Sequence, residues 1–380
     1  MKAVLSICKV DPLESIEKMN RDFMKKRSPE VKLLIKILAI AGFVVIFLLL
    51  AGYAFIRIKA PQLLEFSKGI AEYRFTAQID SLAGARFISG MNGCENLALY
   101  SVENDFAVSC LDGYIVGFSH DPSGVPGIRA SFKAGNAVMG LAIDKQGILY
   151  AAVCENSMEE WRTRGGGLYR ISRDLSSKER ISADFPSMNG ICLDGAGNLY
   201  FASSNFNFLQ PEGTIYRMLY KGDGLFQSPE SYIRDAGLAN GLFYDHFQDK
   251  IFFSNTMGGV YEFTSHDTVL KEVYLKLRFM EACDDLCTDI SGNIWMTDPG
   301  HSTVKMYNPG TNRLVRFSIT GIGQTSSCRI RSEGGQEMLY ISELKKSHQL
   351  MSDNFDGRGV LVVPAQSLLQ LLEPIFIDQK

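Results

Sequence analysis

The chain of 380 residues carries 39 Lys and Arg against 42 Asp and Glu, which leaves a formal net charge of -3 at pH 7. This balance offers no basic surface to a nucleic acid, so nucleic-acid partners are excluded. With 46% hydrophobic and 21% charged residues, the chain is not disordered and can bury a large core.

The first element along the chain is an apolar run near the N-terminus. Residues Ile37–Ile56 contain no charged side chain, and a helix of that length spans about 30 Å, the hydrocarbon thickness of a bilayer. Five basic residues gather on its N-terminal side, and they are Lys25, Lys26, Arg27, Lys32 and Lys36. This bias predicts a single-pass membrane protein with a cytoplasmic N-terminus.

We therefore expect a cytoplasmic segment at 1–32, a transmembrane helix at 33–57, and the remainder outside the cytoplasm, either periplasmic or extracellular. The alternatives are a buried core helix and a cleaved signal peptide. The run is long and apolar for a core helix, and a segment of about 36 residues before it is too long for an ordinary signal peptide.

Seven of the 8 cysteines lie beyond the apolar run. An odd number cannot all pair within one chain, and no Cys-x-x-Cys with paired histidines points to zinc. Most of these cysteines fall within apolar strand patterns, such as Ile191-Cys192-Leu193, and this predicts that they are buried as small hydrophobic side chains.

A motif recurs through the rest of the chain with spacings of 44, 50, 51, 44 and 42 residues. Each copy contains short β-rich runs separated by turns, and no helical period lies between them. The copies start at Asn96-Leu97, Gly140-Leu141, Gly190-Ile191, Gly241-Leu242, Asp285-Leu286 and, more weakly, Ser327-Cys328-Arg329-Ile330. Such units are typical of the blades of a β-propeller, the alternative being a sandwich with coincidental spacing.

We therefore predict an all-β fold, a six-bladed β-propeller over residues 88–380, preceded by a single transmembrane helix. Val360–Val363 would be the third strand of the last blade. Residues 58–87 would form a linker with a candidate ring-closing strand at Tyr73–Ala77, which would leave no long sheet edge exposed.

The clearest motifs lie in blades three to five, where Asn240-Gly241-Leu242 and the run from Asp284 to Trp295 stand in register. They resemble the calcium-dependent six-bladed propellers of the gluconolactonase/regucalcin group and the paraoxonase-like arylesterases and lactonases. The resemblance covers about residues 90–345. It implies that one metal is bound by side chains at the starts of the inner strands, with Glu95, Asn189, Asn240 and Asp284 as the candidate ligands.

Carboxylate and amide oxygens are ligands that Ca²⁺ accepts in loose geometry, so one Ca²⁺ is the expected cofactor. The alternative is that these Asn and Asp residues only cap turns. The chain departs from the paraoxonase pattern at Met139, where that family has a histidine. It departs again at Asn96, where an acidic ligand of a second calcium would stand, so a second calcium is not implied.

A third carboxylate would over-neutralise Ca²⁺, so Asp285 is a candidate base, with Asp298 and His301 as further candidate catalytic residues. One function implied by the resemblance is a membrane-anchored calcium-dependent hydrolase of a lactone or ester, acting through a metal-polarised carbonyl and an activated water. The alternative is a non-catalytic propeller subunit that binds or assembles a membrane protein complex. The expected partners are the lipid bilayer, other membrane protein subunits and a small lactone or ester.

Overall fold

The computed structural model describes residues 28–59, 64–100, 105–120, 126–163, 165–205, 207–278, 281–346 and 356–370. The chain divides into two compact units, Met1–Lys59 and Ala60–Lys380. In the first unit, helix α2 (Pro29–Lys59) is the one helix of the described residues that is long and apolar enough to cross a membrane. Its most apolar 18-residue window has a mean hydropathy of 3.0. This length and composition fit a membrane anchor and a signal sequence alike.

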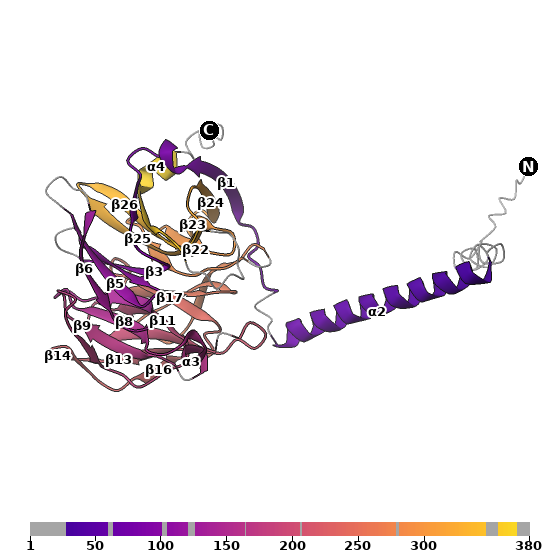
Figure 1. The fold of residues 1–380 in the computed structure, drawn as a ribbon, viewed down its shortest axis with the longest axis horizontal. Helices are drawn as coiled ribbons and strands as arrows, with labels where there is room; N and C mark the ends of the chain where they lie inside the picture. The colour runs from indigo at the N-terminus through magenta and orange to yellow at the C-terminus, as the bar shows by residue number, and fades with distance from the viewer. Residues whose placement is uncertain are drawn as a thin grey trace, which may run out of the picture. The chain divides into compact units, whose positions relative to one another are not determined.

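The second unit is a six-bladed β-propeller, and each blade has four antiparallel strands (Figure 1). The first three blades, from the inner strand outwards, are β3 (Cys94–Leu99), β4 (Phe106–Cys110), β5 (Tyr114–His120) and β6 (Pro126–Lys133); β7 (Ala137–Ile143), β8 (Leu149–Cys154), β9 (Gly167–Ile171) and β10 (Lys178–Arg180); and β11 (Met188–Leu193), β12 (Leu199–Ser204), β13 (Gly213–Met218) and β16 (Glu230–Ile233).

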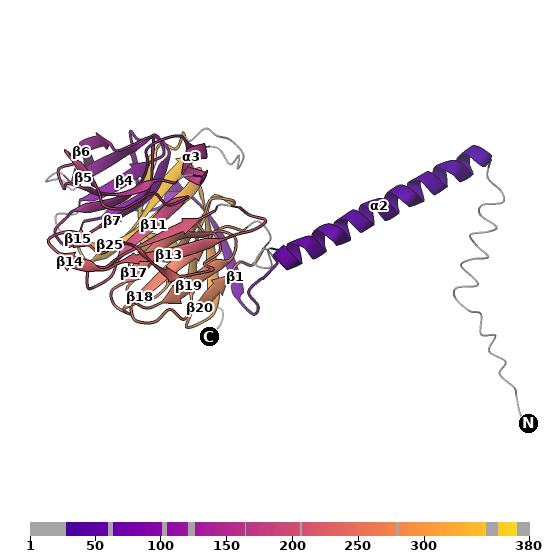
Figure 2. The same cartoon turned by 90° about the horizontal axis from the view of Figure 1, so that it is seen from below.

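The last three blades follow the same order, and Figure 2 shows strands of blade four side by side. They are β17 (Ala239–Asp245), β18 (Lys250–Asn255), β19 (Gly259–Phe263) and β20 (Lys271–Leu275); β21 (Leu286–Thr288), β22 (Ile294–Asp298), β23 (Thr303–Asn308) and β24 (Arg313–Thr320); and β25 (Gln324–Glu333), β26 (Gln336–Lys345), β27 (Gly359–Pro364) and β2 (Arg86–Ser89). The smaller elements are η2 (Ile79–Ser81), α3 (Met158–Thr163), the hairpin β14 (Tyr220–Gly222) and β15 (Leu225–Phe226), and α4 (Ala365–Leu369).

The inner strands contact one another in sequence around the ring, and β25 of blade six contacts β3 of blade one. Apolar clusters fill the spaces between neighbouring blades. The seven cysteines beyond the apolar run are all buried, as their strand patterns predicted. The predicted third strand of the last blade at Val360–Val363 is confirmed as part of β27.

The ring closes through β2, which pairs antiparallel with β27. The expectation that Tyr73–Ala77 closes the ring is therefore wrong. That segment lies in β1 (Ala71–Gln78), which pairs in parallel with β24 and forms a fifth strand at the outer edge of blade five. The free edge of β24 provides hydrogen-bond partners for the backbone of β1. The turn at η2 then leads the chain into β2, which lies beside β27. The expected domain boundary between 87 and 88 falls inside the closing strand.

Glycines of the repeat allow neighbouring inner strands to approach closely. A Cβ atom at Gly140 would lie 2.1 Å from the carbonyl oxygen of Asn189, and one at Gly190 would lie 2.2 Å from the carbonyl oxygen of Asn240. No side chain fits at either position, because backbone of the next blade fills the space. The repeated glycine therefore places the asparagine of the following blade against the preceding inner strand.

Aspartates at the opposite ends of the inner strands cap turns. The Oδ1 atom of Asp194 accepts hydrogen bonds from the backbone N–H groups of Ala196 and Asn198, both at 2.9 Å, and Oδ2 accepts the Tyr200 hydroxyl at 3.2 Å. The equivalent bonds in blades two and five join Asp144 to Tyr150 at 3.1 Å and Asp289 to Trp295 at 2.9 Å. These aspartates, which are not among the candidate ligands, cap the turns that follow the inner strands.

Candidate metal centre

The four candidate ligands come from the beginnings of the inner strands of four blades. Glu95 lies in β3, Asn189 in β11 and Asn240 in β17, while Asp284 stands two residues before β21. All four side chains are buried. Polar side chains in such a place need partners, and those partners show what the site can hold.

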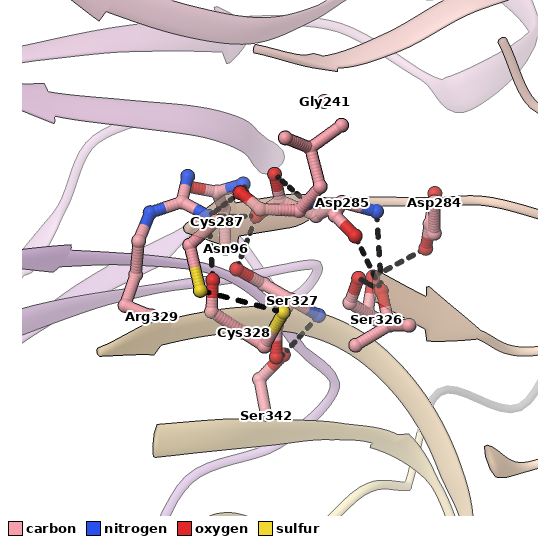
Figure 3. A network of polar contacts seen from close by, with 12 residues as sticks. Asn96, Gly241, Asp284, Asp285, Cys287, Ser326, Ser327, Cys328, Arg329 and Ser342 are labelled. Atoms are coloured by element: carbon pink, nitrogen blue, oxygen red, sulfur yellow. Dashed lines mark hydrogen bonds and ion pairs between the residues drawn. The ribbon is translucent and has the colours of Figure 1, made fainter. Parts of the chain in front are cut away.

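Glu95 and Asp284 meet at one hydroxyl group. The Oγ atom of Ser326, in β25, lies 2.7 Å from Oδ2 of Asp284 (Figure 3). It also lies 2.9 Å from Oε2 of Glu95. A hydroxyl has a single hydrogen, so it can donate to only one of two ionised carboxylates. Two buried carboxylates that share one O–H therefore require either a proton or a cation beside them.

The charges of these two carboxylates are poorly compensated by the protein. Burial, together with the charge of the neighbouring Asp285, raises the pKa of Asp284 to about 7. Burial and the charge of Asp284 raise the pKa of Glu95 well above its usual value. A bound cation would reverse both effects by supplying the missing positive charge.

Amide and hydroxyl groups complete the set of oxygen donors. The Nδ2 group of Asn240 donates hydrogen bonds to Oδ1 of Asp284 and, at 3.1 Å, to the Oγ1 atom of Thr256. Among the described residues no group of three or more His, Cys, Asp or Glu side chains is placed to hold a metal ion. A metal here would therefore depend on amide and hydroxyl oxygens beside two carboxylates, and hard oxygen donors of this kind fit Ca²⁺.

Asp285 is bound to another set of partners, although it follows Asp284 directly. Its Oδ2 atom lies 2.6 Å from Nη1 of Arg329, accepts Nδ2 of Asn96 at 3.0 Å and is hydrogen-bonded by the hydroxyl of Ser327 (Figure 3). Its Oδ1 atom accepts the backbone N–H of Leu286 at 2.8 Å. The Arg329 guanidinium thus neutralises this third buried carboxylate, and both carboxylate oxygens already have donors.

The other two candidate catalytic residues contact each other within a buried ionic network of blade five. Oδ2 of Asp298 lies 3.1 Å from Nδ1 of His301 and 3.0 Å from Nη1 of Arg316. Nζ of Lys305 lies 2.9 Å from Glu281 and 3.6 Å from Asp298, and all three of these side chains are fully buried. His301 is the exposed end of the network, because its side chain keeps 35% of its surface accessible.

The cations of this network hold its carboxylates in the ionised form. Burial alone would raise the pKa of Asp298, but Lys305, His301 and Arg316 lower it to about 2. Glu281 behaves in the same way, since Lys305 and Arg316 outweigh the effect of burial and lower its pKa to about 2. A carboxylate with so low a pKa is a poor proton acceptor but a good orienting partner for an imidazole.

Comparison with known proteins agrees with this architecture. Residues 189–344 match the family described as the SMP-30/gluconolactonase/LRE-like region. The matched stretch runs from β11 to β26 of the propeller. It includes Asn189, Asn240, Asp284 and Ser326, while Glu95 lies outside it. No curated protein sequence matches the chain.

Several solved structures share the fold. A gluconolactonase from Xanthomonas campestris is 18% identical, with 74% of this chain and 90% of that chain covered at a TM-score of 0.51. A calcium-binding protein, regucalcin, from Agrobacterium tumefaciens is 14% identical, with 77% and 95% covered at 0.54. A luciferin-regenerating enzyme is 15% identical, with 74% and 95% covered at 0.54. At these identities the likeness shows the propeller fold alone.

The sequence did not predict the hydrogen-bond and ion-pair partners of the candidate site residues. Ser326, which joins the two carboxylates, precedes the weak sixth copy of the motif, and its place at the start of an inner strand was the available signal. Arg329 is part of that copy, but nothing in its spacing links it to Asp285 in the neighbouring blade. The cations Lys305 and Arg316 lie in outer strands of blade five, where the repeat gives no signal for charged residues.

Proposed function

We propose that the protein is a membrane-anchored calcium-dependent hydrolase of a lactone or ester. The observation that supports this most directly is the sharing of one Ser326 hydroxyl by Glu95 and Asp284 in a propeller with an SMP-30/gluconolactonase/LRE-like region. Two buried carboxylates beside a buried amide fit a single Ca²⁺, with Glu95, Asn189, Asn240 and Asp284 as its ligands. When bound, Ca²⁺ would polarise a substrate carbonyl and stabilise the negative charge that develops on its oxygen.

Other side chains of the protein orient the candidate ligands and accept a proton from water. Asn240, held by Thr256, fixes the orientation of Asp284. Asp285 and Arg329 form a buried ion pair without net charge, and this pair holds the segment after Asp284 in place. His301 is the proposed proton acceptor, because Asp298 contacts its Nδ1 atom and thereby orients the ring with Nε2 left to take a proton from water. Asp285 and Asp298 act here by positioning.

The proposal is tested by measuring the metal content and hydrolysis of the full-length protein with a panel of lactones and aryl esters. We expect one equivalent of Ca²⁺ and measurable turnover. Asp284→Asn should lose both, whereas Asp289→Asn, which alters a buried turn-capping aspartate at the other end of the same inner strand, should keep both. Hydrolysis that is unaffected by removal of calcium would refute the proposed mechanism.

His301→Gln separates the base from the metal site. It should retain calcium and lower turnover by about 10²- to 10⁴-fold, the usual contribution of a general base. Loss of calcium in this variant would instead make His301 part of the metal centre. Unchanged turnover with calcium bound would remove His301 from the mechanism.

A non-catalytic propeller that binds or assembles membrane protein subunits is the second candidate function. It is favoured by the pairing of Asp285 with Arg329 and of Asp298 with Arg316, which leaves no free carboxylate among the predicted bases. Met139, which stands where paraoxonases have a histidine, is buried in an apolar cluster. Calcium binding without hydrolysis of any lactone or aryl ester would support this function over the first.

We also propose that α2 anchors the protein, with the N-terminus in the cytoplasm and residues 60–380 outside it, as the basic residues before the helix indicate. Protease added to the outer face of intact spheroplasts should digest or release the propeller and spare residues 1–30. Cleavage of the N-terminal segment with protection of the propeller would reverse the orientation.

A further inference from the structure

Four of the buried cysteines stand in two facing pairs. The Sγ atom of Cys287 in β21 lies 3.9 Å from the Sγ atom of Cys328 in β25, and both side chains are fully buried. Cys94 in β3 and Cys110 in β4 are paired in the antiparallel register, next to a register shift between Cys94 and Asn96. The first pair joins blade five to blade six, and the second joins two strands of blade one.

Both pairs have geometry from which a disulfide bond can form. Directly opposed residues of antiparallel strands have Cα atoms about 4.5 to 5.5 Å apart, which lies within the range of about 4.4 to 6.8 Å found across disulfides. For Cys287 and Cys328, the Sγ atoms lie 3.9 Å apart and must move about 2 Å closer to reach a bond length near 2 Å.

The other three cysteines of the described propeller lack such a contact. The thiol of Cys154 donates hydrogen bonds to the carbonyl oxygens of Asn156 and Ser157 at 3.3 and 3.4 Å. Cys192 lies opposite Tyr200 in its strand pair. Cys283 is near enough to Cys328 to interact with it electrostatically, but the direct sulfur contact of Cys328 is with Cys287.

We propose that Cys94–Cys110 and Cys287–Cys328 are disulfide bonds of the protein when its propeller folds in a compartment that supplies a disulfide oxidant. In each pair, two thiols lose two protons and two electrons as the S–S bond forms. The oxidant's own disulfide takes up these electrons and protons and leaves as a dithiol. Because the four sulfurs are buried, this exchange takes place before the blades close.

The two bonds would constrain the strands that carry the candidate metal ligands. Cys94 directly precedes Glu95. Cys287 stands three residues beyond Asp284, and Cys328 stands two residues beyond Ser326. A bond between β21 and β25 would close a loop between residues 41 positions apart and fix the joint across which Ser326 reaches Asp284. The proposal does not depend on hydrolysis, since it concerns only the sulfur contacts and the folding compartment.

The test uses the full-length protein solubilised from membranes and denatured in an alkylating reagent without reductant, followed by peptide mapping. We expect Cys94, Cys110, Cys287 and Cys328 to remain unalkylated and to appear in two cross-linked peptides. The remaining cysteines should be alkylated. Reduction before alkylation should release all four and add one alkyl group to each.

A second experiment separates the geometry from the compartment. The full-length protein is unfolded, reduced and refolded in detergent with oxidised glutathione, and the same two cross-links should form. Cys287→Ala should leave Cys328 alkylated, whereas the matched control Cys192→Ala should keep both cross-links. Alkylation of all four thiols in the refolded protein, or a cross-link between Cys283 and Cys328, would overturn the assignment.

Discussion

Removing the negative charge of Asp285 should destabilise the propeller by an amount that follows from its burial. The side chains of Asp285 and Arg329 keep 4% and 10% of their surface accessible, and their charged atoms lie 2.6 Å apart. Asp285→Asn leaves the Arg329 guanidinium buried without its counter-ion, which costs about 3 to 5 kcal/mol of the free energy of unfolding. Over a unit that runs from Ala60 to Lys380, with about 2.1 cal/mol/K of unfolding entropy per residue, the melting temperature should fall by roughly 4 to 8 °C.

Thermal melting of the full-length protein in detergent, followed by far-ultraviolet circular dichroism, measures this shift. Arg329→Met should cause a similar loss of stability. The double variant should recover part of that loss, because a buried pair of uncharged side chains is often as stable as a buried ion pair. The control is Asp184→Asn, which breaks an exposed ion pair with Arg180 and should change stability by less than about 1 kcal/mol. Shifts that add in the double variant, or single shifts no larger than the control's, would refute the reasoning.

Three further results are expected. Stability from the Glu281 and Asp298 ion pairs is present above their ordinary pKa values near 4 and is lost as pH falls through their folded values of about 2. Protonation of each carboxylate should therefore lower the free energy of unfolding by on the order of 2 kcal/mol between pH 5 and 2. A melting temperature that stays constant over that range would contradict the network. Gly190→Ala should cost about 1 to 3 kcal/mol or more, since its Cβ would lie 2.2 Å from a carbonyl oxygen. Gly127→Ala, with no atom within 4 Å, is its control and should stay within about 0.5 kcal/mol in denaturant titration. Chelation of calcium should lower the melting temperature. If calcium was in hundredfold excess over its Kd, the free energy of unfolding should fall by about 2.7 kcal/mol, and Asp284→Ala should abolish this response. An unchanged melting curve after chelation would count against the ligand set.

The repeat could be predicted because local chemistry sets it in every blade. An aspartate such as Asp194 caps the turn after an inner strand, and a glycine such as Gly190 allows the next blade to approach. These requirements act within a few residues or between adjacent blades, so they recur at the same spacing. The six-bladed propeller follows from them, and so does the placement of the candidate ligands at the starts of inner strands.

The ring closure and the charge pairs could not be predicted in the same way. Both β1 and β2 have the composition of strands, and composition does not choose between the free edges of β24 and β27. The pairing of Arg329 with Asp285 depends on the register between two blades, and a single sequence does not give that register. Both features depend on contacts between segments far apart in the sequence that do not recur from blade to blade, whereas the confirmed features depend on contacts that the repeat encodes in every blade.

The closing strand also determines when the propeller can be completed during synthesis. β2 is made near the beginning of the unit, but its partner β27 begins only at Gly359. At about 5 to 20 residues per second, β2 waits roughly 15 to 55 s for that partner. Until then its edge is unpaired and available to chaperones or to other chains. A truncated product that ends before Gly359 keeps the edge open permanently, so an unfinished chain differs from a finished one by an exposed strand that proteolytic quality control can recognise.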